Sequence, residues 1–274
     1  MTSKRRVFQC SCCSPSLVHL LVILGSFYIY YKDQLADTAP SIHTTTSTNT
    51  KMDAIPVSNE AKGEPESLTN KTLETGAAMV QSFDPPKRLC AHFNAFHVYV
   101  NEPSRVSEAN HYCAHVNDEV RQCLLYDSPL PTAKLIGVEY MVSERIFNEL
   151  DPGEQKLWHS HVFEVKSGML IMPTPPGVPQ SAWEIAENKE MEQVVHLYGK
   201  VYNLWQTDRG DKVPLGQPQL MTSFTAKDHF DFDKYVGDRD RRFGVDSKHK
   251  AEVRAYIEEP KTHPNADALW NGKA

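Results

Sequence analysis

The sequence predicts an α+β fold, with one compact domain in which helices flank a mixed or antiparallel sheet. Segments rich in β-branched and aromatic residues occur beside segments of helical spacing, but the two kinds do not alternate as in a doubly wound sheet. From about Phe83 onward, apolar and polar residues mix normally, and roughly 190 residues are enough for one buried core. We divide the chain into an anchor at 1–32, a linker at 33–84, a domain at 85–260 and a tail at 261–274.

The first segment has the pattern of a membrane anchor. Lys4, Arg5 and Arg6 precede a Leu/Val/Ile run that begins at Leu17, and aromatic residues close it near Tyr31. At about 15 residues the run is shorter than the roughly 20 that a transmembrane helix needs. The pattern favours a retained anchor, while a cleaved signal peptide and a buried core helix are alternatives. Cysteines beside such a segment are candidate S-palmitoylation sites, here Cys10, Cys12 and Cys13.

The second segment is predicted to be a disordered tether. Residues 33–84 are rich in Thr, Ser and Asn and contain few large apolar side chains, so burial cannot offset the entropy of ordering. Asn70, in the string Asn70-Lys71-Thr72, is a glycosylation acceptor if this part of the chain enters the secretory pathway.

The elements of the domain follow from turn residues and periodicity. Residues 120–126 and 135–142 are predicted strands, separated by a turn at 127–129. Ser143 is expected to cap a short helix that ends before Pro152. Residues 162–165 and 169–172 have the pattern of a hairpin.

The rest of the domain is expected to be mainly helical. A capping box at Ser181 starts a helix that the apolar spacing extends to about Trp205. Residues 219–224 form a further predicted strand, and an amphipathic helix is expected at 247–259, before Pro260.

Charge and cysteine spacing exclude some classes of function. The net charge of −6 argues against a dedicated nucleic-acid-binding protein, which usually presents a basic face. Cys90, Cys113 and Cys123 have neither zinc-ligand spacing nor a paired disulfide pattern, which favours buried thiols.

Histidines are the main candidates for chemistry. On a helix, His111 and His115 would share one face and could bind one metal ion. His159 and His161 would point the same way on a strand, and Glu164 follows them closely. Two imidazoles and a carboxylate suit a divalent transition metal. The alternative is that these histidines only make hydrogen bonds in the core.

Several longer strings in the domain resemble the oil body-associated protein family, whose shared domain was long catalogued as of unknown function. The resemblance covers roughly residues 86–246 and rests on strings in the family's order: 91–97, 111–113, 121–128, 133–140, 157–161, 164–168, 198–200 and 208–211. Two departures stand out. Asn203 occupies a position where the family commonly has histidine, and typical members lack an N-terminal extension.

The resemblance implies a lipid-droplet or membrane-associated protein, non-enzymatic, that supports lipid-body integrity. The membrane or droplet surface is then the expected partner. The short anchor would lie in the interface and leave the domain in the cytosol. A metal-dependent enzyme of unknown substrate is the alternative function. A third hypothesis is a membrane protein of the endoplasmic reticulum with a lumenal domain.

Overall fold

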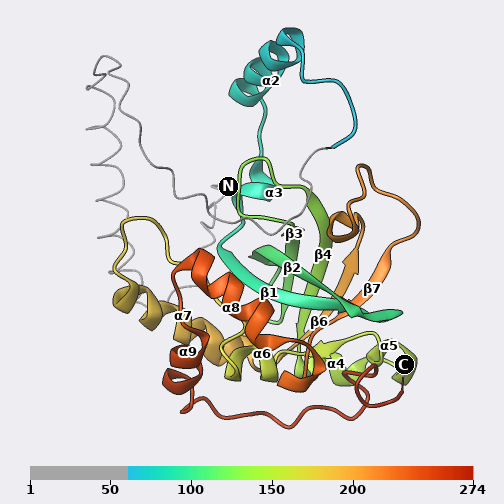
Figure 1. Cartoon of the computed structure of the whole chain (residues 1–274), viewed down its shortest axis with the longest axis vertical. Coiled ribbons are helices and arrows are strands. Elements are labelled where there is room, and N and C mark those ends of the chain that lie inside the picture. Colours follow the sequence, from blue (N-terminus) through green and yellow to red (C-terminus); the bar gives the residue numbers. More distant parts are fainter. Residues whose placement is uncertain (1–60, 274) are drawn as a thin grey trace, which may run out of the picture. The chain divides into compact units, whose positions relative to one another are not determined.

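The computed structural model describes residues 61–273 and confirms the α+β class. Its strands form one antiparallel sheet in the order β4-β3-β2-β1-β7-β6-β5, and β4 also pairs with β6, which closes the sheet into a barrel (Figure 1). The strands are β1 (Ala91–Tyr99), β2 (Glu102–His115), β3 (Val120–Tyr126), β4 (Leu135–Ser143), β5 (His159–Ser160), β6 (Leu197–Asn203) and β7 (Gln219–Thr222).

Strand alternation fills the barrel with buried side chains. One row runs around the barrel through directly paired residues, each of them buried: Cys113, Cys123, Glu139, Val201, Met221 and Tyr99. Glu139 is the charged member of this row. The closed sheet therefore places a carboxylate among apolar side chains.

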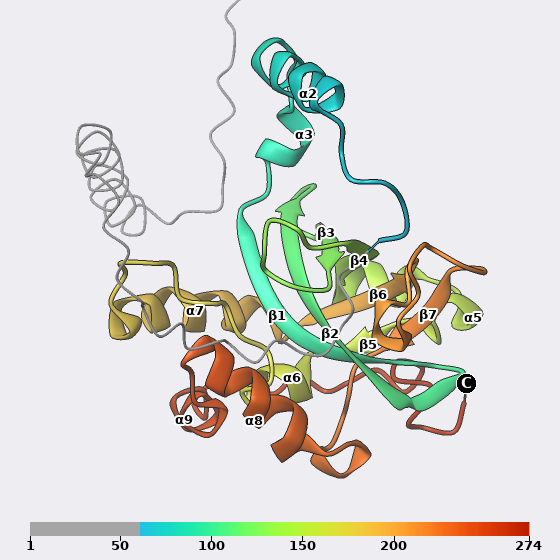
Figure 2. The same cartoon turned by 45° about the horizontal axis from the view of Figure 1, so that its top comes forward.

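Helices cover the outer face of β1. Phe96 and Val98 of that strand pack against Phe232 and Val236 of α8 (Phe232–Phe243). Figure 2 shows α8 beside α6 (Val162–Lys166) and α9 (Ser247–Val253), with α7 (Gln180–Val194) next to them. The remaining helices of residues 61–273 are α2 (Leu68–Val80), α3 (Asp84–Lys87), α4 (Glu144–Glu149) and α5 (Pro152–Gln155), with 3-10 turns at Thr207–Arg209 and Lys227–His229.

The predicted elements are partly confirmed. The strands near 120–126 and 135–142 form, and the Ser143 side chain accepts a hydrogen bond from the backbone N–H of Ile146. The predicted hairpin at 162–172 is wrong, because 162–166 form α6 and Gly168 turns the chain with a φ of 75°. The helix expected to reach Trp205 ends at Val194, since 197–203 pair with β4, β5 and β7.

The expectation of three buried thiols is also wrong. Cys113 and Cys123 lie directly opposite each other on β2 and β3 and form a disulfide, and Cys90 is exposed. Their ten-residue separation indicates nothing until the strand register is known. The disulfide therefore follows from the register of β2 and β3, and not from the spacing of the cysteines in the sequence.

Part of the predicted linker is helical. Helix α2 begins after Ser67, whose side chain accepts a hydrogen bond from the N–H of Asn70, and none of its residues is buried. Within 61–273, no helix combines the length and apolar character needed to cross a membrane. The predicted anchor at 1–32, with Cys10, Cys12 and Cys13, lies outside the described residues.

Candidate metal centre

Six titratable side chains converge inside the barrel, each at most 2% exposed. They come from four strands and from α6 with the residue before it: His97 on β1, His111 on β2, Glu139 on β4, His159 on β5, and His161 and Glu164 at α6. Barrel closure and the short β5 bring these distant positions together.

Glu139 is the centre of the cluster. Its Oε2 lies 3.2 Å from Nε2 of His111, while its Oε1 lies 3.3 Å from Nε2 of His159 and 3.5 Å from Nε2 of His161. Nε2 of His161 is also 3.7 Å from Oε2 of Glu164. Three imidazoles thus face one buried carboxylate.

Backbone carbonyls orient two of these rings. Nδ1 of His111 lies 3.2 Å from the carbonyl oxygen of Ala109, and Nδ1 of His161 lies 2.9 Å from that of Leu197. A carbonyl only accepts, so each Nδ1 carries the proton and donates. The Nε2 atoms are consequently the ones directed at Glu139, the arrangement that metal-binding histidines usually have.

Several polar atoms in the cluster lack a hydrogen-bond partner. They are Nδ1 of His97, both ring nitrogens of His159, Oε1 of Glu139 and both carboxylate oxygens of Glu164. The His159–Glu139 contact has the distance of an ion pair but not the alignment of a hydrogen bond. Buried polar groups are nearly always satisfied, so these atoms require a partner.

The surroundings shift the pKa values of the cluster in opposite directions. Burial alone would raise the pKa of Glu139, but the contacts with His111, His159 and His161 hold it well below its ordinary value. Burial alone would lower the pKa of His161, yet Glu139 and the charge of Glu164 raise it to about 9. Burial lowers the pKa of His97 and raises that of Glu164. The arrangement therefore holds a neutral imidazole beside a carboxylate, a pair of donors that suits a metal ion.

A glycine lets strand β6 lie close to the point where Glu139 and His159 meet. Gly199 on β6 pairs with Met141 on one side and with His159 on the other. A Cβ at this position would lie 2.3 Å from Oε1 of Glu139 and 2.8 Å from Nε2 of His159. Any larger residue would displace one of the two groups.

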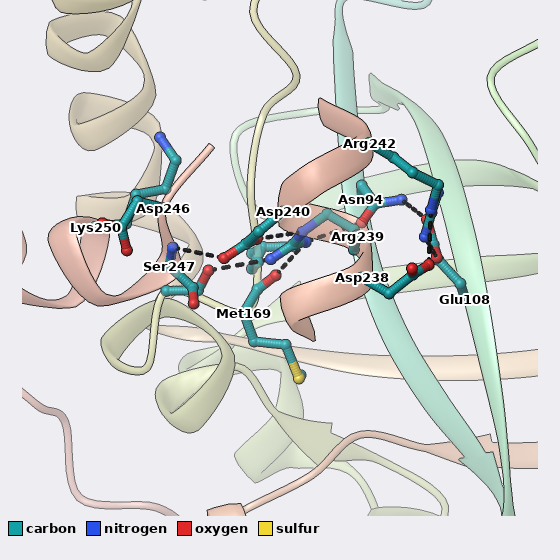
Figure 3. A network of polar contacts seen from close by, with 12 residues as sticks. Asn94, Glu108, Met169, Asp238, Arg239, Asp240, Arg242, Asp246, Ser247 and Lys250 are labelled. Carbon is teal, nitrogen blue, oxygen red and sulfur yellow. Dashed lines mark hydrogen bonds and ion pairs between the residues drawn. The ribbon is translucent and has the colours of Figure 1, made fainter. Parts of the chain in front are cut away.

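Two fully buried arginines fix the segment that follows Glu164. Arg254 donates to the carbonyl oxygens of Val165 and Leu170 and to Glu187. Figure 3 shows Arg239 of α8 between Asn94 and the carbonyl oxygen of Met169, to which it donates at 2.9 Å and 2.7 Å. These bonds tie α8 and the segment after α9 to the chain that supports the cluster.

A C-terminal residue fixes β5 from its other side. Ser160 lies between His159 and His161 and donates two hydrogen bonds to Asp267. Its backbone N–H donates to Oδ1 and its hydroxyl to Oδ2, each at 2.8 Å. Asp267 is buried and has a φ of 57°, the one positive φ of a non-glycine residue among residues 61–273. The segment after residue 260 therefore helps to position the two histidines.

The structure brings together four of the five predicted metal ligands, His111, His159, His161 and Glu164. It places His115 elsewhere, half-buried at the end of β2, because residues four apart on a strand are about 13 Å apart. His97 and Glu139 join the cluster instead. Neither residue has a spacing signal in the local sequence.

Two further positions are now placed. Asn203, where the resemblance leads one to expect histidine, is buried on β6, and its Oδ1 has no hydrogen-bond partner. Asn70, the possible glycosylation site, is exposed in the first turn of α2.

Comparison with known proteins identifies the domain. Residues 83–258 match the family described as "Protein of unknown function (DUF1264)". Oil body-associated protein 1A of Zea mays is 42% identical over 215 residues, which are 78% of this chain and 87% of that protein. Oil body-associated protein 1B of Arabidopsis thaliana is 41% identical over 212 residues, 77% and 85% of the two chains.

A third relative, oil body-associated protein 2A of Arabidopsis thaliana, is 44% identical over 165 residues, 60% of this chain and 64% of its own. No solved structure matches the chain. The family model covers more than half of the chain, and the first two relatives cover most of the domain and exceed 40% identity. The chain therefore belongs to the oil body-associated protein family.

Proposed function

We propose that this protein binds the surface of lipid bodies and supports their integrity, with helix α2 as one of the elements that enter the lipid. The observation that carries the proposal is the exposure of the helix's large apolar side chains. Leu68, Leu73, Met79 and Val80 are between 66% and 83% exposed, and the helix has no buried residue. The names of the relatives, which place them at oil bodies, support the same surface.

The pattern of α2 suits an interface better than a membrane span. Leu73 and Val80 are seven residues apart and lie on one side of the helix, whereas Lys71 and Ala78 lie roughly opposite. Thirteen residues are too few to cross a bilayer, but an amphipathic helix can rest at the boundary between headgroups and acyl chains. A lipid body has only a monolayer, which is the surface that such a helix can use.

The N-terminal segment is proposed to add a second attachment. Residues 1–32 would lie in the same interface, strengthened by acylation of Cys10, Cys12 or Cys13. In this arrangement the barrel stays on the cytosolic side, and Asn70 is never glycosylated. If the domain were lumenal instead, Asn70 would be modified.

Flotation of the full-length protein with artificial lipid droplets, triacylglycerol covered by a phosphatidylcholine monolayer, tests the role of α2. We expect the double substitution Leu73→Glu and Val80→Glu to reduce the floating fraction several-fold, because charges on the apolar side cannot enter the lipid. The matched control, Lys71→Gln with Ala78→Glu, changes the net charge by the same two units on the other side and should float like wild type. Equal flotation of all three proteins would reject α2 as the lipid-binding element.

Localisation in cells tests the N-terminal attachment. A fluorescent fusion of the whole chain should surround lipid droplets, and deletion of 1–32 should release a large part of it. Unchanged localisation after the deletion would contradict the anchor. A glycosidase-sensitive shift in mobility that disappears in Asn70→Gln would indicate a lumenal domain.

A second candidate function is a metal-dependent enzyme of unknown substrate. The buried cluster around Glu139 favours it, because two imidazoles and a carboxylate are ligands of catalytic metals. Stoichiometric metal in the purified protein is the first requirement of this function.

A further inference from the structure

We propose that the barrel binds one divalent transition-metal ion at Glu139, with His97 and His159 as its other two protein ligands. One potential ligand atom from each of these residues lies within 4.8 Å of the other two, and all three residues are buried. Two imidazoles and a carboxylate suit zinc, iron, cobalt or manganese, whereas calcium and magnesium prefer sites made of oxygen ligands. This site is independent of lipid binding by α2.

The unpartnered atoms are the first argument for an ion. Nδ1 of His97, Oε1 of Glu139 and both ring nitrogens of His159 are buried without a hydrogen-bond partner. A buried polar group without a partner destabilises a fold, and here all three residues of one small cluster contain such a group. A single cation could bind Oε1 of Glu139 and one ring nitrogen of each of the two histidines.

The neighbouring histidines are the second argument. His111 contacts Oε2 of Glu139, and its own Nδ1 donates to the carbonyl oxygen of Ala109. This contact occupies Oε2 and leaves Oε1 as the carboxylate oxygen available to the ion. Residues outside the ligand set that contact a ligating group are a regular part of metal sites.

The unpartnered atoms favour one of two alternative positions for the ion. A second group, His159 with His161 and Glu164, also has ligand atoms within 4.8 Å. Each residue of the first group contains a buried polar atom without a hydrogen-bond partner, whereas in the second group only His159 and Glu164 do. The first group is therefore the one in which every residue needs a partner.

Three protein ligands leave other coordination positions of the ion open. Sites with a full set of four protein ligands are typically structural, whereas three ligands and an open position are typical of catalytic metals. The proposed site would therefore bind water or a small anionic or carbonyl ligand beside the metal.

Metal binding to the purified full-length protein tests the proposal. After removal of metal with a chelator, the protein is titrated with Zn²⁺ and separately with Co²⁺, and bound metal is measured by elemental analysis. We expect about one ion per chain and a visible absorption band with Co²⁺. Glu139→Gln and His97→Ala should each weaken binding by about 100-fold or more, because loss of an outer partner alone costs 10- to 100-fold.

Matched variants separate the ligand set from general damage. His115→Ala removes a half-buried histidine outside the cluster and should bind Zn²⁺ like wild type. Glu164→Gln removes a ligand of the alternative group and should weaken binding far less than Glu139→Gln. Because Gln has nearly the shape of Glu, Glu139→Gln should fold, and circular dichroism checks this.

The increase in melting temperature on adding Zn²⁺ provides a second readout. It should be present in wild type and His115→Ala and absent in folded Glu139→Gln. Substoichiometric metal in the wild type, or equal affinity in Glu139→Gln, would overturn the proposal. Loss of binding in Glu164→Gln with retention in His97→Ala would overturn the placement at Glu139.

Discussion

Replacing Gly199 by alanine tests whether β6 is a close wall of the cluster. The new Cβ would lie 2.3 Å from Oε1 of Glu139, where an ordinary contact is at least 3.4 Å, so the carboxylate or the strand must move by about 1 Å. The Cβ would also meet the ring of His159, at 2.8 Å from Nε2. Since strands surround both groups, neither can move freely.

The expected cost follows from overpacking of a filled interior. Inserting one methyl group into such a site destabilises a fold by about 1–3 kcal/mol. For a domain of about 200 residues, each kcal/mol lowers the melting temperature by about 2–4 °C. We therefore expect Gly199→Ala to melt between about 2 and 12 °C below the wild type in a calorimetric or circular dichroism scan.

A second glycine provides the control. Gly237 lies within α8, where a Cβ would meet only the end of the Arg241 side chain at 4.0 Å. Gly237→Ala should be neutral or stabilise by about 0.4–1 kcal/mol, because alanine restricts the unfolded chain. If Gly199→Ala melted at or above the wild-type temperature while the circular dichroism spectrum was unchanged, the close contact at β6 would be refuted.

Three further substitutions test the supports of the fold. Asp267→Ala removes two buried hydrogen bonds and should cost about 2–4 kcal/mol in urea unfolding, and a cost below 1 kcal/mol would mean that β5 does not depend on it. Cys123→Ser opens a disulfide whose cysteines are 10 residues apart and should cost about 2–3 kcal/mol, while Cys90→Ser, at an exposed thiol, should change nothing. Arg254→Met leaves Lys250 as the cation beside buried Glu187, which also accepts from the N–H of Met172. It should cost about 3–5 kcal/mol, and unchanged unfolding would show that Lys250 suffices.

Local patterns were sufficient for some elements and misleading for others. β3 and β4 have strand-type composition, and Ser143 caps the next helix, so sequence alone predicts all three. Residues 197–203 have apolar spacing that also fits a helix, and only pairing with β4, β5 and β7 decides the conformation. Tertiary pairing overrode local periodicity there.

The residues of the metal cluster also divide into those that local sequence indicates and those that only the fold brings in. The pair His159 and His161 and the nearby Glu164 are close in sequence, which made them candidates. Glu139 and His97 are separated from them by 20 residues or more and reach the cluster through barrel closure. Likewise, the hydrogen bonds from Ser160 to Asp267 span 107 residues, a distance at which no periodicity or motif indicates a contact.

The contact between Ser160 and Asp267 has a consequence for the order of events during synthesis. Domains fold progressively from the N-terminus as the chain leaves the ribosome. Strands β1 to β4, β6 and β7 can pair before residue 267 has been made, but β5 obtains its outer hydrogen bonds only afterwards. A nascent chain stalled before this residue would contain His159 and His161 without the contact that positions them. The proposed metal centre would thus become able to bind its ion late, after most of the barrel has formed.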